Sequence, residues 1–214
     1  MSFTLNHYTQ KPASGKPPKQ IILLLHGYGS NGRDLISLAP FWAKAVPDAI
    51  FISPDAPFPC EAGMGFQWFS LMEYTQAALL RGTKEAHPIL DSYIDALLHE
   101  YNLTDKDLAL VGFSQGTMMS LYTGIRRANK IAGVLGYSGA LIHENDLAPL
   151  PKPPIHLIHG QADPVVTVER YESAKSDLTD AGFTVSGHST PHLEHSIDED
   201  GIQSGASFIE TIFQ

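Results

Sequence analysis

A chain of 214 residues with 43% hydrophobic and 17% charged residues is long enough to bury one large core and too apolar to be disordered. Its formal charge of −9, from 14 basic and 23 acidic residues, argues against electrostatic binding to nucleic acid or to an anionic membrane surface. The composition predicts a single domain over residues 1–214, with an uncharged or cationic partner.

The start of the chain and its one cysteine bear on the cellular compartment. The first 20 residues lack the charged start and apolar core of a secretory signal, and no apolar run approaches the length of a membrane span. Cys60, in a Pro-rich loop, excludes an internal disulfide framework and suits a reducing compartment. We expect a cytoplasmic protein without stable membrane insertion.

Strands and helices alternate along most of the chain. An apolar run predicts a strand, and apolar residues at helical spacing predict a helix. In chain order the sequence predicts an edge strand at 3–9, a strand at 21–25, a helix at 32–45, a strand at 49–52, a helix at 83–100, strands at 108–112 and 131–135 with a helix starting after 114 between them, a strand at 155–158, a helix at 168–181, a short strand at 183–187 and a helix at 201–213. This order predicts an α/β fold with a mostly parallel, twisted sheet and helices on both faces.

The segment from 54 to 82 has no predicted element and is rich in large apolar side chains. It is too short for a full cap domain over a binding site. Two interpretations are open: a satellite core beneath a long loop, or the wall of a shallow acyl-binding groove. On the second interpretation, Met64 and Trp68, together with Val165 from a later loop, contact the substrate.

The turn after the strand at 108–112 predicts a nucleophile. Gly112-Phe113-Ser114-Gln115-Gly116 matches the G-x-S-x-G elbow, in which a strand turns directly into a helix and a strained serine presents its hydroxyl. The five residues alone also fit an ordinary Gly-rich turn. The strand before and the helix after them favour the elbow, so Ser114 is the candidate nucleophile.

A serine nucleophile needs a base, and the base needs an acid that orients it. In enzymes with this elbow the acid and then the histidine follow the serine in the chain. Asp163 is the candidate acid because it directly follows a buried strand in a turn restricted by Pro164, although an Asp before Pro is also a common turn cap. His195 is the candidate base, with His192 as the alternative. The other acids considered are Glu144, Asp146, Asp177, Asp180 and Asp198.

Two backbone amides are candidates for stabilising the negatively charged oxygen of a tetrahedral intermediate. The Gln115 amide lies at the start of the helix after the elbow, and the Tyr28 amide lies in the loop after the strand at 21–25. The second assignment competes with an ordinary Gly-rich exit from a strand. A metal site is a weaker hypothesis, because the histidines at 188, 192 and 195 have Pro191 among them and no helix to align them. We expect no metal and no cofactor.

Seven motifs spread over nearly the whole chain resemble those of one family. They are LLLHGYGSNG from Leu23, SPDAP from Ser53, QWFS from Gln67, VGFSQG from Val111, GYSG from Gly136, HGQADPVV from His159 and LEHSI from Leu193. Together they resemble the phospholipase/carboxylesterase branch of the α/β-hydrolases, which includes acyl-protein thioesterases and small bacterial carboxylesterases.

The resemblance implies an α/β-hydrolase fold and a triad of Ser114, Asp163 and His195. It also implies an oxyanion hole from the Tyr28 and Gln115 amides, no metal or organic cofactor, and often a dimer. The sequence departs from many thioesterase members at Tyr28, where leucine is usual, at Ser30, where aspartate is usual, and at Ser70, where an acidic residue is usual. The departures favour a carboxylesterase over an acyl-protein thioesterase.

The leading hypothesis is therefore a serine carboxylesterase acting on short- to medium-chain esters, with thioesters or lysophospholipids as further substrates. The main alternative is a non-catalytic α/β-hydrolase that binds a small ligand, because a fold alone does not settle function. A serine peptidase is disfavoured, because the chain has no room for a gating domain.

Overall fold

The computed structural model describes residues 5–144 and 147–214, and it contains a seven-stranded sheet in the order β1-β3-β2-β6-β7-β8-β9. Strand β1 is antiparallel to β3, and all the other neighbouring strands are parallel. The predicted α/β-hydrolase fold is confirmed. The strands are β1 (His7–Gln10), β2 (Gln20–Leu25), β3 (Ala49–Pro54), β6 (Leu108–Phe113), β7 (Gly133–Tyr137), β8 (Ile155–Gly160) and β9 (Val185–Thr190).

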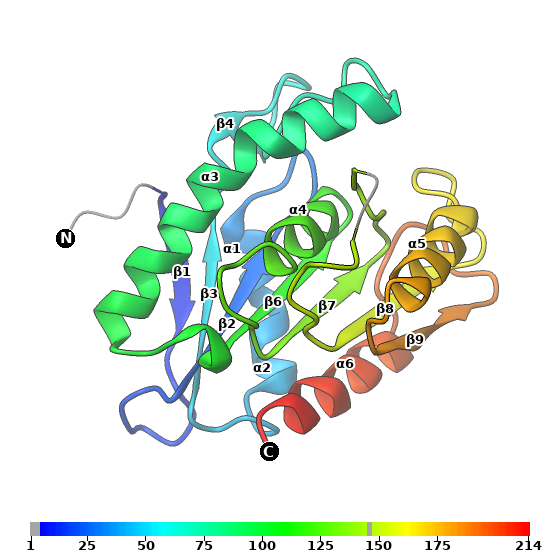
Figure 1. Cartoon of the computed structure of the whole chain (residues 1–214). Helices are drawn as coiled ribbons and strands as arrows, with labels where there is room; N and C mark the ends of the chain where they lie inside the picture. Colours follow the sequence, from blue (N-terminus) through cyan, green and yellow to red (C-terminus); the bar gives the residue numbers. More distant parts are fainter. Residues whose placement is uncertain (1–4, 145–146) are drawn as a thin grey trace.

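Helices cover both faces of the sheet (Figure 1). One face carries α3 (Gln76–Tyr101), α4 (Gln115–Gly124) and α5 (Val168–Asp180), and the other carries α1 (Gly32–Leu35), α2 (Ala39–Trp42) and α6 (Glu199–Ile212). Successive residues of a strand point to opposite faces. In β2, Ile21, Leu23 and Leu25 therefore join the first of two cores, and Ile22 and Leu24 join the second. This double burial explains why the central strands are apolar runs rather than alternating patterns.

The predicted helix at 32–45 is wrong as a single element. The chain forms α1, a 3-10 turn (Ile36–Leu38) and α2. Pro40 lies in the first turn of α2. Proline has no amide hydrogen to donate to the preceding turn, so the first turn of a helix is the position where it costs least.

Helix α3 begins seven residues earlier than the predicted start at 83. Thr75 caps it, because its side-chain oxygen accepts a hydrogen bond from the Ala78 amide at 3.2 Å. Gly82 is typical of a helix boundary, but here it lies within α3 and packs on Phe69. A Cβ at Gly82 would lie only 2.7 Å from the Phe69 Cβ. The glycine is explained by close packing.

The segment between β3 and α3 is more ordered than predicted. It contains a small hairpin of β4 (Phe58–Pro59) and β5 (Phe66–Gln67). Trp68 and Phe69 are buried beneath the loop, but they belong to the first of the two cores rather than to a separate satellite core. Met64 and Met72 are exposed.

The remaining elements are close to their predicted positions. The predicted edge strand at 3–9 is β1, although residues 3 and 4 lie outside the described residues. A short 3-10 turn (Asp105–Asp107) precedes β6. Within residues 5–144 and 147–214, no helix has both the length and the apolar character needed to cross a membrane. Because β2, β6 and β8 are parallel, the loops that follow them meet at one edge of the sheet.

Candidate functional site

Ser114 occupies the sharp turn between β6 and α4. Its backbone has φ 53° and ψ −117°, a conformation that residues other than glycine rarely adopt. A side chain at Gly116 would collide with the carbonyl oxygen of Leu25 on β2, and one at Gly112 would collide with the amide of Thr117. The glycines therefore allow α4 to begin directly against the sheet, and this arrangement forms the elbow.

Asp163, in the loop after β8, has a fully buried side chain whose two oxygens have different partners. Oδ1 accepts hydrogen bonds from the amides of Val165 and Val166 at 2.8 and 2.9 Å. Oδ2 accepts a hydrogen bond from Nδ1 of His195 at 2.7 Å. The carboxylate is therefore both the turn cap and the partner of the histidine, two roles that the sequence presented as alternatives.

His195 lies in the loop after β9, and its side chain is 18% exposed. Its ring packs against Phe113, the residue before Ser114, with 4.9 Å between the ring centroids. Because Nδ1 donates to Asp163, a neutral His195 has its lone pair on Nε2. That nitrogen is the one that can accept a proton from a serine hydroxyl.

The other acids considered from the sequence lie elsewhere, and His192, the alternative base, is exposed in the loop after β9. Asp198 caps α6, and Glu144 pairs with Lys84. Asp177 and Asp180 belong to α5, and Asp146 lies outside the described residues. Among the described residues, no three histidine, cysteine or acidic side chains lie close enough together to hold a metal ion.

The loop after β2 packs directly against the nucleophile. A Cβ on Gly27 would lie 3.3 Å from the Ser114 Cβ. Two amides of this loop already have acceptors, because Gly29 donates to the Phe66 carbonyl and Ser30 donates to the Gly27 carbonyl. In the described part of the chain, no backbone oxygen accepts a hydrogen bond from the Tyr28 amide. The Gln115 amide starts α4, where the helix dipole favours negative charge.

The family model for phospholipases and carboxylesterases matches residues 8–213. The chain belongs to the phospholipase/carboxylesterase family. It is therefore a hydrolase that acts on ester bonds, as the sequence predicted.

Curated relatives and solved structures agree with this family. Esterase YpfH of Escherichia coli (strain K12) is 28% identical over 88% of this chain and 81% of the relative. Acyl-protein thioesterase 1 of Gibberella zeae is 26% identical over 88% of each chain. The crystal structure of esterase PE8 is 38% identical, with a TM-score of 0.92 over 97% of this chain and 99% of that one. The Bacillus cereus carboxylesterase, 21% identical, shares the fold with a TM-score of 0.79 over 98% of this chain and 95% of that one.

His26 orients the Tyr28 amide in this phospholipase/carboxylesterase family member, a role that sequence reasoning missed. Its Nε2 accepts a hydrogen bond from the Ala56 amide at 3.0 Å, so the proton of the neutral ring is on Nδ1. Nδ1 lies 2.7 Å from the Gly27 carbonyl oxygen and donates to it. The Gly27 carbonyl and the Tyr28 amide point in opposite directions across one planar peptide, so this bond also directs the amide. Burial lowers the pKa of His26 and favours the neutral ring.

The Gln115 side chain holds the segment that follows β5. Its oxygen accepts a hydrogen bond from the Trp68 amide at 2.9 Å, and its nitrogen donates to the Phe69 carbonyl at 2.8 Å. Trp68 is completely buried, and its indole donates to the His26 carbonyl. The assignment of Trp68 to the substrate-contacting wall is therefore corrected: it supports the loops from beneath. The apolar run was informative, but it could not show which side chains point inward.

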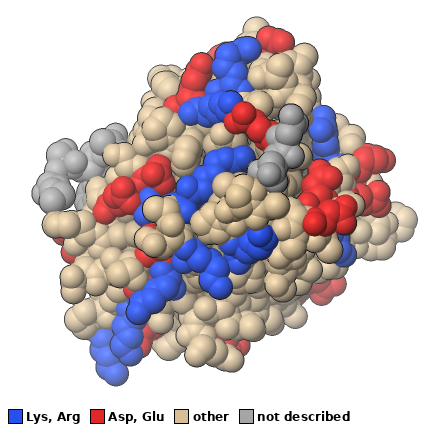
Figure 2. Space-filling model, in the orientation of Figure 1, with Lys and Arg blue, Asp and Glu red and all other residues tan. Residues whose placement is uncertain are grey.

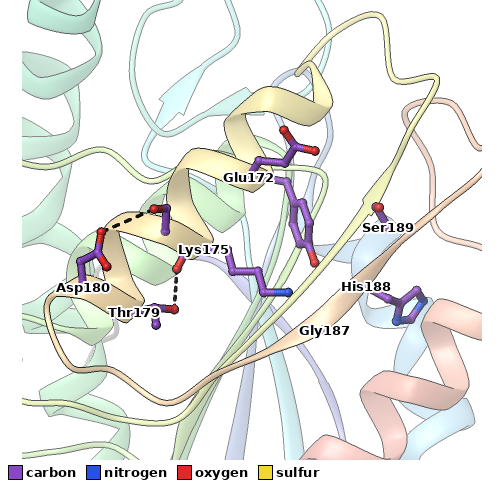
Figure 3. Close-up of a pocket in the computed structure, with 9 residues that line it drawn as sticks. Glu172, Lys175, Thr179, Asp180, Gly187, His188 and Ser189 are labelled. Atoms are coloured by element: carbon purple, nitrogen blue, oxygen red, sulfur yellow. Dashed lines mark hydrogen bonds between the residues drawn. The ribbon is translucent and has the colours of Figure 1, made fainter.

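Met64 and Val165, the other two predicted substrate contacts, are exposed by 76% and 59%. A separate groove of about 610 Å³ runs between α5 and β9 (Figure 3). Its lining includes Lys175, His188 and Ser189, but none of the three triad candidates.

Proposed function

We propose that the protein is a serine carboxylesterase that hydrolyses short- to medium-chain esters through an acyl-enzyme on Ser114. The observation that carries this proposal is the 2.7 Å hydrogen bond between His195 and the buried Asp163, with the His195 ring packed on Phe113, the residue before the strained Ser114. Family membership, and the names of relatives that are esterases, support the same reaction class.

The reaction proceeds in two steps. The Ser114 oxygen attacks the ester carbonyl while Nε2 of His195 takes the hydroxyl proton, and the Tyr28 and Gln115 amides donate to the resulting oxyanion. His195 then gives that proton to the leaving alcohol, and the acyl group stays on Ser114. A water molecule, deprotonated by His195, attacks the acyl-enzyme, and His195 returns the proton to the Ser114 oxygen as the acid is released. Asp163 holds the His195 ring in the required tautomer throughout. None of these steps requires a metal or a cofactor.

Replacement of Ser114 by alanine tests the nucleophile. Turnover of p-nitrophenyl butyrate by the S114A variant should fall to the background rate, because no other hydroxyl occupies the elbow. A fluorophosphonate should label the wild-type protein on Ser114 and leave the variant unlabelled. The circular dichroism spectrum checks that the variant is folded. Undiminished turnover would remove Ser114 from the mechanism, and an unlabelled wild type would favour the non-catalytic binder.

Acyl-chain preference follows from the short segment between β3 and α3. It adds a small hairpin rather than a cap domain, so it offers a limited apolar surface. We expect kcat/KM to peak at short to medium acyl chains in a p-nitrophenyl ester series from C2 to C16. A rate that rises steadily to the longest chain would contradict this prediction. The same series with thioesters tests the acyl-protein thioesterase alternative.

We also propose a homodimer, which the resemblance often implies, and a cytoplasmic location, because a single cysteine suits a reducing compartment. Both stay predictions. Light scattering of the purified protein tests the first, and cell fractionation tests the second.

A further inference from the structure

Glu61 lies in the turn between β4 and β5, and its carboxylate joins several segments around the site. Its Oε1 accepts hydrogen bonds from the Tyr28 hydroxyl at 3.2 Å, the Ser70 hydroxyl at 2.9 Å and the Leu71 amide at 2.9 Å. The Gln67 amide nitrogen lies 3.4 Å from Oε2 and donates to it, and the Glu61 backbone amide donates to Gln67 at 3.0 Å. One side chain therefore connects the loop after β2, the hairpin and the chain that follows it.

Tyr28 lies between the nucleophile and the hairpin. The residue before it, Gly27, packs on Ser114, and the residue after it, Gly29, donates to the Phe66 carbonyl at 2.9 Å. Ser30 accepts a hydrogen bond from the Phe66 amide at 2.8 Å. A displacement of the hairpin would therefore move the backbone that carries the Tyr28 amide.

The Gln115 side chain holds the same segment from its other end. It bonds to Trp68 and Phe69, and Glu61 bonds to the next two residues, Ser70 and Leu71. The two residues proposed to donate their amides to the oxyanion thus both have side chains tied to the stretch from 61 to 71. Through the Glu61 carboxylate and the backbone of residues 68–71, Tyr28 is therefore connected to Gln115.

We propose that Glu61 is a positioning residue of the ester site, which holds the Tyr28 and Gln115 amides at a fixed separation through its bonds to Tyr28 and to residues 70 and 71. The inference deepens the proposed function and rests on it. Tyr28 and Ser70 are also two of the positions at which the sequence departs from many thioesterase members. Because both side chains bond to Glu61, these two departures belong to one structural feature.

A double-mutant cycle between Glu61 and Tyr28 tests the proposal. In Tyr28→Phe the backbone amide stays, and the hydroxyl that bonds to Glu61 is lost. We expect E61A and Y28F each to lower kcat for p-nitrophenyl butyrate about tenfold with KM changed less than twofold, since a displaced donor loses part of the 10²- to 10³-fold effect of a missing one. The double variant should be no slower than E61A, because the two changes break the same link.

Several outcomes would overturn the proposal. An unchanged kcat in E61A is one, and a double variant in which the two losses multiply is another. The third is an equal loss of kcat in the matched control E85A, which removes an exposed acid on α3. If E61A does not fold, E61Q keeps the size of the side chain and should lower kcat by a smaller factor, and an unchanged kcat in E61Q would count against the proposal.

Hydrogen exchange separates this inference from the proposed function, because it needs no substrate. In E61A the amides of residues 28–30 and 66–71 should exchange faster than in the wild type, and those of β6 and β7 should not. Unchanged exchange at 28–30 would overturn the proposal even in an active esterase. A wild type that hydrolyses no ester would refute the proposed function and its oxyanion hole, whatever the exchange result.

Discussion

At the scale of single residues, Asp163 shows how one carboxylate serves both the fold and the site. Oδ1 accepts from two amides of its own turn, and Oδ2 accepts from His195. The two turn amides hold the carboxylate by local backbone structure, independently of its bond to the histidine. His159 lies on the same side, with Nε2 3.5 Å from Oδ2, and donates to the Val166 carbonyl at 2.7 Å.

Replacement of Asp163 by asparagine tests this division of roles. We expect kcat for p-nitrophenyl butyrate to fall on the order of 10⁴-fold, as for the equivalent change in a serine protease triad, because an amide favours the wrong tautomer of the histidine. The side-chain oxygen of asparagine can still accept from the turn amides, so the melting temperature should change little. A variant that keeps a tenth of the activity would show that Asp163 is only a turn cap.

At the scale of elements, the segment between β5 and α3 is held in place by side chains from elsewhere in the chain. Gln115 binds its backbone at Trp68 and Phe69, and Gly82 of α3 lets the helix approach Phe69 closely. The elbow therefore positions the loop over the site as well as the nucleophile.

Gln115→Ala should destabilise the fold by about 2–4 kcal/mol, because it leaves the buried Trp68 amide and Phe69 carbonyl without partners. Urea unfolding monitored by tryptophan fluorescence measures this change. The matched control is Gln203→Ala on α6, whose exposed side chain donates to exposed Glu199 at 3.3 Å. It should shift the free energy of unfolding by less than about 0.5 kcal/mol. Equal effects of the two changes would contradict the role assigned to Gln115.

Gly82→Ala separates helix propensity from packing, because the two predict opposite changes in the free energy of unfolding. Propensity alone predicts that alanine stabilises a helix interior by about 1 kcal/mol. The new Cβ would lie 2.7 Å from Phe69, so we expect a net destabilisation of about 1–3 kcal/mol. Thermal unfolding decides between the two, and a raised melting temperature would refute the packing argument.

At the scale of the whole molecule, charge is unevenly distributed. The formal charge is −9. On the face shown in Figure 2, however, lysine and arginine side chains gather in a band across the middle, with acidic side chains beside them. Arg127, which is buried, contacts Asp91, Asp95 and Asp105, each at 2.7 Å. It ties the chain just after α4 to α3 and to the turn before β6. Net charge alone describes neither feature.

Buried histidines make the stability of the whole fold depend on pH. His156 contacts Ser186 on β9 at 2.7 Å and Ser204 on α6 at 2.8 Å. Burial lowers its pKa to about 4, with a smaller contribution from the charge of His188. Burial also lowers the pKa of His26 and of His159.

The sign of the pH effect follows from these lowered pKa values. Between pH 6.5 and 4 the unfolded state binds more protons than the folded state, so the free energy of unfolding decreases as the pH falls. The stabilisation that the neutral His156 contributes is complete above pH 6.5 and is lost toward pH 4. The shift in its pKa corresponds to about 3 kcal/mol at most. Urea unfolding at several pH values measures it. In His156→Gln the slope below pH 6.5 should be smaller, and an unchanged slope would exclude His156 as a source.

The sequence by itself determined the α/β order of elements and indicated Ser114, Asp163 and His195 as the candidate triad, with His192 left as the alternative base. These depend on local patterns: an apolar strand, a Gly-rich turn, and loops that must meet at the carboxyl edge of a parallel sheet. Only the tertiary structure decided that α3 begins at Gln76, that Trp68 is buried beneath the site, and that Glu61 joins Tyr28 to Ser70. Each of these depends on contacts between residues far apart in the chain, such as Gly82 with Phe69 or Gln115 with Trp68. Such contacts leave no periodic signal in the sequence, because they exist only after the layers have packed.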